Sequence, residues 1–130
     1  MKNLADFKKK KVKTYKDLNV YRHSFDLAIS ILRFTRGFPH EERYGITNQI
    51  RRASSSIPAN LAEGWAKRKY ENVFKRHIMD CIGSCEEVKV WLEISWKCGY
   101  FDQKTFENLK GQYAEVGAML TSLMNRWKTY

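Results

Sequence analysis

The sequence predicts an all-α protein, an up-down-up-down four-helix bundle, and two features carry that prediction. Apolar residues recur at three- and four-residue spacing in four segments, the period of a helix with a buried side. Residues that typically end or begin helices separate these segments, among them Gly37, Pro39, Gly99 and Asp102. Short links between amphipathic helices favour antiparallel neighbours.

The first expected helix covers about residues 17–36 and has two apolar sides. One stripe is formed by Leu18, Tyr21, Phe25, Ala28, Ile29 and Leu32. The second stripe, roughly opposite at about 100° per residue, is formed by Val20, Leu27, Ile31 and Phe34. We expect one side to face the chain's own core and the second stripe to be covered by another copy, which predicts a homo-oligomer. The alternative is a helix that is merely central within its own bundle.

The second expected helix, about residues 46–67, contains a proline near its middle. Pro58 lacks a backbone donor and crowds the carbonyl of Ser54, so a kink or break is expected there, with serine hydroxyls bonding to the freed carbonyl. Two helices that meet at the proline are the alternative.

A polar stripe runs along the same helix, beside its apolar stripe. Its members follow one another at steps of three or four residues: Gln49, Arg52, Ser56, Asn60 and Glu63. At the edge of a core such groups must find partners. We expect a polar seam that faces another subunit or a ligand; the alternative is a set of hydrogen bonds and ion pairs within the bundle.

The third expected helix covers about residues 70–98, and the fourth begins after Asp102, its expected N-cap. The buried side of the third is expected to hold Phe74, Ile78, Cys81, Cys85, Val88, Leu92 and Trp96. That of the fourth is expected to hold Phe106, Leu109, Tyr113, Val116, Gly117, Leu120, Met124 and Trp127. Gly99 is expected to end the third helix in the left-handed conformation.

Composition and charge describe a single basic globular domain. The 130 residues are 43% hydrophobic and 29% charged, and no apolar run approaches the roughly 20 residues of a membrane span. Three cysteines are a poor disulfide framework, so we expect a cytoplasmic protein without a membrane partner. Of the net charge of +10, seven lysines against one aspartate lie in residues 1–16, expected to be a flexible lysine-rich arm before the bundle of residues 17–130.

This charge favours a polyanion, with solubility alone as the alternative. We predict nucleic-acid contacts at two sets of cations. The arm contributes Lys8, Lys9, Lys10, Lys11 and Lys13; the link between the second and third helices contributes Lys67, Arg68, Lys69, Lys75 and Arg76, extended by Arg51. Trp65 or Tyr70 would stack on an unpaired base, and the contacts would be mainly to phosphates. The alternative is a solvated basic turn with a buried Trp65.

Other chemistries find little support. His77, Cys81 and Cys85 share one helical face, but a single helix seldom wraps zinc, so packed thiols are preferred and no metal or cofactor is expected. Glu86 and Glu87 diverge by about 100° on a helix, which excludes a carboxylate pair. Ser54, Ser55 and Ser56 lack an oxyanion-forming turn. We therefore predict a non-enzyme without a small-molecule substrate.

Several spaced pieces of this sequence resemble one family. They are "FP..E" at Phe38, Pro39 and Glu42; "Q..RA" at Gln49, Arg52 and Ala53; "SI..NLAEG" from Ser56 to Gly64; "GS..E" at Gly83, Ser84 and Glu87; and Gly99 with Tyr100. This pattern, over about residues 17–125, resembles that of the four-helix-bundle proteins encoded by intervening sequences in bacterial large-subunit ribosomal RNA genes. Leu61 and Ile46 are harmless departures from it.

The resemblance implies a bundle that assembles into a ring-like homo-pentamer with a basic surface and no catalytic residues. It leaves three functions open: an RNA-binding structural protein, which we prefer; an accessory subunit of a diversity-generating retroelement, binding reverse transcriptase and template RNA; or a protein-interaction scaffold without nucleic acid. A gene position inside an intervening sequence of an rRNA gene would support the first, and a neighbouring reverse transcriptase gene with a variable repeat would support the second.

Overall fold

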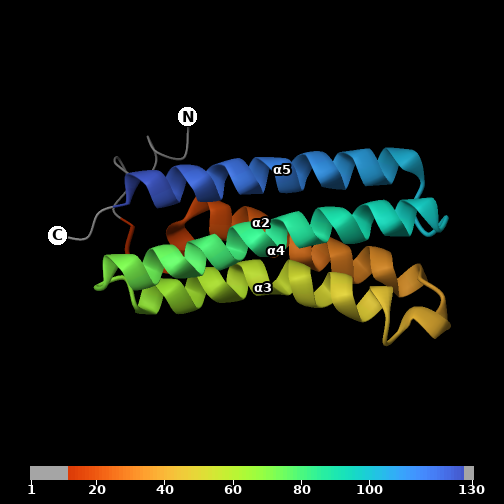
Figure 1. The fold of residues 1–130 in the computed structure, drawn as a ribbon, viewed down its shortest axis with the longest axis horizontal. Coiled ribbons are helices and arrows are strands. Elements are labelled where there is room, and N and C mark those ends of the chain that lie inside the picture. Colours follow the sequence, from red (N-terminus) through yellow and green to blue (C-terminus); the bar gives the residue numbers. More distant parts are fainter. Residues whose placement is uncertain (1–11, 128–130) are drawn as a thin grey trace.

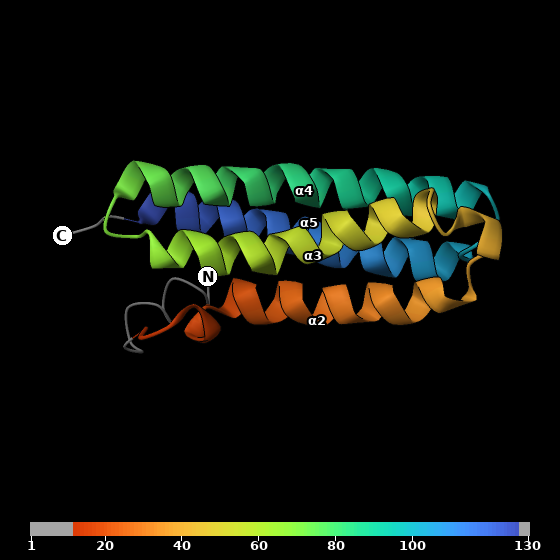
Figure 2. The same ribbon diagram turned by 90° about the horizontal axis from the view of Figure 1, so that it is seen from below.

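The computed structural model describes residues 12–127, and within that range it is helical without strands, which confirms the all-α prediction. The long helices are α2 (Asn19–Phe34), α3 (Ile46–Ala66), α4 (Glu71–Lys97) and α5 (Gln103–Arg126). Three short 3-10 helices precede or link them: η1 (Tyr15–Asp17), η2 (Thr35–Gly37) and η3 (His40–Glu42). Each long helix packs on the next and α5 packs on α2, so α2 and α4 occupy opposite corners of an antiparallel bundle (Figure 1, Figure 2). None of the described helices combines the length and apolar character needed to cross a bilayer.

The apolar stripe of α2 that we expected to be covered by another copy faces the core of its own chain. Val20, Leu27 and Ile31 are buried among core residues of the same chain, so the prediction that they form a subunit interface is wrong. Phe34, the fourth member, is exposed, but its ring meets Phe101 edge-on at 5.9 Å. The two stripes have similar apolar content, and only the packing of α2 on α3 and α5 decides which one is covered.

The other apolar stripe of α2 remains partly exposed. Phe25 is 44% and Leu32 41% accessible, and Tyr21 and Ile29 are half-buried. Helix α2 therefore does have a second apolar side, as expected, but that side is formed by the stripe with Phe25 and Leu32 instead of the stripe with Val20, Leu27 and Ile31.

Helix α3 passes through Pro58 as one helix, which was one of the two alternatives. The hydroxyls of Ser54 and Ser55 donate to the carbonyl of Arg51, and that of Ser56 donates to Ala53. These bonds lie one to three residues earlier than predicted, on carbonyls of residues 51–53 rather than on Ser54. Serine side chains in a helix commonly bond back to the preceding turn in this way.

The predicted inner faces of α4 and α5 are confirmed. On α4, six of the seven expected residues are fully buried; the seventh, Trp96, is half-buried and stacks on Phe106 with 4.6 Å between ring centroids. The inner face of α5 is buried along its length, with Gly117 and Met124 half-buried. The helix boundary is also as predicted, because Gly99 has φ +82° and Asp102 Oδ1 accepts a hydrogen bond from the Thr105 amide at 2.7 Å.

Two distant pieces of the sequence meet at the end of the bundle that holds the α2–α3 and α4–α5 links. The Phe38 ring lies 5.2 Å from Tyr100 and 5.1 Å from Phe101. Tyr100 donates its hydroxyl hydrogen to Glu42 Oε2 at 2.8 Å, while Glu42 Oε1 accepts from the Ile46 amide at the start of α3. The hydrogen bond to Glu42 raises the pKa of Tyr100 to about 12. These contacts fasten the two links together.

Residues 12–16 belong to the folded part of the chain, which corrects the expected arm boundary at residue 16. The Asp17 carboxylate accepts from the amides of Thr14 and Lys13, and these bonds lower the pKa of Asp17. Tyr15 packs edge-on against Tyr21 at 4.9 Å. The cations Lys8, Lys9, Lys10 and Lys11 lie outside the described residues.

Candidate nucleic-acid interface

Most of the predicted cations of the folded body lie at one end of the bundle. The antiparallel order brings the start of α2, the end of α3, the start of α4 and the end of α5 to this end, opposite the aromatic links just described (Figure 1). We call it the basic end and define it by the described cations Lys13, Lys16, Lys67, Arg68, Lys69, Lys75, Arg76 and Arg126. At this end, residues 67–70 form the predicted turn between α3 and α4.

Aromatic residues organise this turn in two different ways. Trp65 is buried against Phe74 and Trp127, with ring centroids at 6.2 and 5.6 Å, so it is not available to stack on a base. The Arg68 guanidinium lies 4.4 Å above the Trp65 ring and donates to the Trp65 carbonyl at 3.0 Å. Tyr70, in contrast, is 63% exposed. Of the two aromatic candidates, only Tyr70 can meet a ligand.

Two of the predicted cations are paired with carboxylates of their own helix. Lys67 Nζ lies 3.0 Å from Glu63 Oε2, a bond that lowers the pKa of Glu63, and Lys75 Nζ lies 3.1 Å from Glu71. Both are surface pairs one helical turn apart, and such pairs contribute little to stability. A phosphate that approaches these lysines must compete with a neighbouring carboxylate.

Among the predicted cations at this end, Lys69 on the turn and Arg76 in α4 have the fewest interaction partners. Both are exposed, and no carboxylate among the described residues lies within ion-pair distance of either side chain. The Lys69 ammonium stands 5.8 Å from the Tyr70 ring. Lys69, Tyr70 and Arg76 therefore offer two cations and an aromatic face without the loss of an ion pair.

The basic end also holds cations that the sequence analysis did not propose. Lys16 and Arg126 are exposed at the start of the folded chain and at the end of α5, two segments that the antiparallel packing brings to the same end of the bundle. Arg22 fixes the first of these segments by donating to the Lys16 carbonyl at 2.9 Å. Their positions in the sequence are 110 residues apart, so only the topology links them.

Arg51 does not extend this surface, and the prediction that it does is wrong. Its Nε donates to Thr35 Oγ1 at 2.8 Å, and one terminal nitrogen lies 3.4 Å from the Leu32 carbonyl. The guanidinium therefore satisfies acceptors at the C-terminal end of α2. Sixteen residues of helix also separate Arg51 from Lys67, about 24 Å along the axis.

The polar stripe of α3 is largely satisfied within the chain. The hydroxyl oxygens of Ser56 and Ser84, the latter on α4, lie 2.7 Å apart in a hydrogen bond, and Asn60 Oδ1 lies 3.1 Å from His77 Nδ1. An amide oxygen only accepts, so His77 donates from Nδ1. With the Glu63–Lys67 pair, these contacts match the intrachain alternative.

Gln49 and Arg52 form the remainder of the stripe. Gln49 is half-buried and Arg52 is exposed, and neither forms an ion pair or side-chain hydrogen bond with another described residue. For these two residues the expectation of an interface stays a prediction.

Gly64 sets the distance between α3 and α4 beneath the turn. A Cβ atom at this position would lie 2.7 Å from His77 Cβ and 3.2 Å from His77 Cγ. Real Cβ atoms do not approach so closely, so α4 packs against α3 here because residue 64 has no side chain. Asn60 and Gly64, one turn apart on α3, thus both contact His77, the first by a hydrogen bond and the second by close packing.

The thiols of α4 act as packing groups. Cys81 and Cys85 are buried; their sulfur atoms lie 3.4 and 3.0 Å from the carbonyls of Ile57 and Tyr113. Burial raises the pKa of Cys81 to about 12 and that of Cys85 to about 11, so both remain protonated donors at neutral pH. In the described part of the chain no three histidine, cysteine or acidic side chains gather as a metal site.

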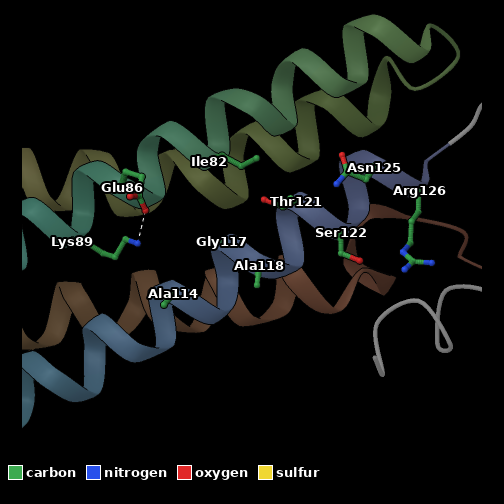
Figure 3. Close-up of a pocket in the computed structure, with 10 residues that line it drawn as sticks. All are labelled: Ile82, Glu86, Lys89, Ala114, Gly117, Ala118, Thr121, Ser122, Asn125 and Arg126. Carbon is green, nitrogen blue, oxygen red and sulfur yellow. Dashed lines mark ion pairs between the residues drawn. The ribbon is translucent and has the colours of Figure 1, made fainter.

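A shallow groove of about 760 Å³ lies between α4 and α5 (Figure 3). Small residues of α5 form its floor, including Ala114, Gly117 and Ala118, and an ion pair between Glu86 and Lys89 borders it on α4. The Glu86–Lys89 pair is closed on itself, and Thr121, Ser122, Asn125 and Arg126 line the groove towards the end of α5. At Arg126, which also belongs to the basic end, the groove reaches that end of the bundle.

The fold and the basic end define a class: an antiparallel four-helix bundle that carries a cluster of cations at one end. The model of the 23S rRNA-intervening sequence protein family matches residues 16–122, and the chain belongs to this family, as the resemblance indicated. No curated protein matches the sequence.

The fold is also found among solved structures. One example is a crystal structure of a protein with unknown function from the S23 ribosomal protein family of Bacteroides thetaiotaomicron VPI-5482. The two chains are 21% identical, with a TM-score of 0.74, over 82% of this chain and 95% of the other. At this identity the likeness supports the fold alone.

Proposed function

We propose that this protein is a non-catalytic RNA-binding protein whose basic end contacts phosphate groups. The observation that carries the proposal is the position of Lys69 and exposed Tyr70 on the α3–α4 turn, with Arg76 in the second turn of α4. Neither cation has a carboxylate of the described residues within ion-pair distance. The family description, 23S rRNA-intervening sequence protein, links the family to ribosomal RNA genes, and for this reason we favour RNA over other polyanions.

The expected binding mode is dominated by electrostatics. Cations of the basic end neutralise phosphates and release condensed counterions, while Tyr70 stacks on an unpaired base. The described surface holds no strand platform of the kind that reads successive bases, so sequence selectivity should be weak.

A matched pair of charge reversals tests this proposal. We compare Lys69→Glu/Arg76→Glu with Lys104→Glu/Lys110→Glu, which removes the same charge from exposed positions in the first half of α5, away from the basic end. Binding of a fluorescein-labelled RNA stem-loop is measured by anisotropy over a range of salt concentrations. Only the first variant should lose affinity, and its slope of log K against log salt should fall by about 1.4–1.8, at about 0.7–0.9 per phosphate contact.

Three results would overturn the proposal. They are equal losses in both variants, affinity of the wild type that does not change with salt, or no binding of the stem-loop by the wild type. A DNA duplex of the same length serves as the competitor, and equal competition would remove the preference for RNA while leaving the phosphate contacts.

We also propose that the protein acts as a homo-oligomer. The half-exposed apolar stripe of α2, with Phe25 and Leu32 at its centre, supports this, because a monomer would leave these side chains in water. The solution mass by light scattering tests it, and a particle of 15.4 kDa at high protein concentration would refute it.

A further inference from the structure

Two helices expose apolar stripes on opposite corners of the bundle. The α2 stripe is centred on Phe25 and Leu32, with half-buried Tyr21 and Ile29 beside them. Charged residues along its exposed flank are mainly basic: Arg22, Arg33 and Arg36, with Asp26 as the acidic member.

The α4 stripe points directly away from the core. Met79 is 59% and Val90 56% exposed; Gly83 lies between them and Ile94 continues the row. Its flanks are acidic, with Asp80, Glu86, Glu87 and Glu93 along the row, Lys89 paired to Glu86, and Arg76 and Lys97 only at its ends. The middle of this face is therefore acidic, although the chain as a whole is basic.

The two stripes cannot cover each other within one chain. Helix α2 packs on α3 and α5, and so does α4, which leaves α2 and α4 diagonally opposed with outward faces that point apart (Figure 2). A partner for each stripe must come from outside the chain.

We infer that the basic apolar stripe of α2 docks on the acidic apolar stripe of α4 of a second copy of this chain. This inference rests on the proposed self-association and adds which faces meet. The charges are complementary, and both rows extend over about 17–22 Å of helix at 1.5 Å per residue. The contact is heterologous: in a pair, one copy keeps an unused α4 stripe and the other keeps an unused α2 stripe, so association does not stop at two copies.

Two double variants separate the two faces. Phe25→Glu/Leu32→Glu spoils the α2 stripe, and Met79→Glu/Val90→Glu spoils the α4 stripe, both by placing carboxylates against apolar groups. A control, Tyr44→Glu/Gln103→Glu, adds the same charge at exposed positions outside both stripes. Sedimentation equilibrium should give 15.4 kDa monomers for each stripe variant, and the wild-type mass for the control. Circular dichroism checks that every variant is helical.

An equimolar mixture of the two stripe variants is the decisive sample. Each variant retains the stripe that the other has lost, so one native contact forms and the mixture gives dimers of one copy of each, about twice the chain mass. If like stripes paired instead, α2 on α2 or α4 on α4, the variant with that stripe intact would dimerise alone and mixing would add nothing.

The outcomes distinguish the two claims. A monomeric wild type overturns the proposed self-association and this inference together. An oligomeric wild type whose mass is unchanged in either stripe variant overturns the pairing alone. Monomeric variants that form no dimer on mixing also overturn the pairing, provided that circular dichroism shows both to be folded.

Discussion

Gly64 offers the sharpest test of how the family motif holds the bundle together. In Gly64→Ala the new methyl group would lie 2.7 Å from His77 Cβ, which is attached to the α4 backbone and cannot rotate away. The two helices must separate, and such overpacking typically costs about 1–3 kcal/mol. Against this, alanine in a helix is favoured over glycine by about 1 kcal/mol.

Gly111 supplies the matched control, because it lies in α5 with no atom within 4 Å of its built Cβ. Gly111→Ala therefore receives the helix-propensity gain without the clash. The difference between the two variants isolates the clash, so Gly64→Ala should be less stable than Gly111→Ala by about 1–3 kcal/mol. Urea denaturation at equal protein concentration measures both free energies of unfolding. Equal stability of the two variants would refute the close-approach argument.

Three further changes probe the links and the core. Arg51→Met should lower the free energy of unfolding by about 1–3 kcal/mol, by removing the hydrogen bonds to the end of α2, and should leave RNA affinity unchanged; a loss of affinity would restore Arg51 to the binding surface. At about pH 8 a thiol reagent should label one cysteine per native chain, Cys98, because the other two are buried, and three after unfolding; faster labelling of a buried thiol would contradict this. The pKa of Tyr100 is raised in the folded state to about 12, so its contribution to stability is complete below about pH 10 and is lost as pH rises towards 12. Tyr100→Phe should make that alkaline loss smaller, as measured by urea midpoints at several pH values, and an unchanged pH profile would exclude the Glu42 contact as its cause.

The sequence predicted the helices and most of the core because both depend on local periodicity. The inner faces of α4 and α5 and the caps at Gly99 and Asp102 follow from spacing and turn chemistry alone. The choice between the two apolar stripes of α2 does not. Val20 and Phe25 are both apolar residues on a helix, and only the positions of α3 and α5 decide that the first is buried and the second exposed.

In the candidate site, too, the sequence predicts what depends on neighbouring residues and does not predict what depends on the packing of distant segments. The cations around the α3–α4 turn lie together in the structure because they are neighbours in the sequence, and their contact with nucleic acid stays a prediction. Arg51 was misplaced because its acceptors lie 16 and 19 residues earlier, on another helix. Lys16 and Arg126 were missed because antiparallel packing alone brings their segments to one end.

The residues that identify the family explain its fold rather than its function. Asn60 and Gly64 both hold His77, Ser56 bonds to Ser84, and Glu42 bonds to Tyr100. A residue whose polar groups are satisfied within its own chain has little free capacity for a ligand. Arg52 differs, since it belongs to the motif but is exposed without an ion pair among the described residues. If motif residues also serve binding or assembly, Arg52 is the first to test, and a neutral substitution there should leave the free energy of unfolding within about 0.5 kcal/mol while changing the RNA affinity or the solution mass.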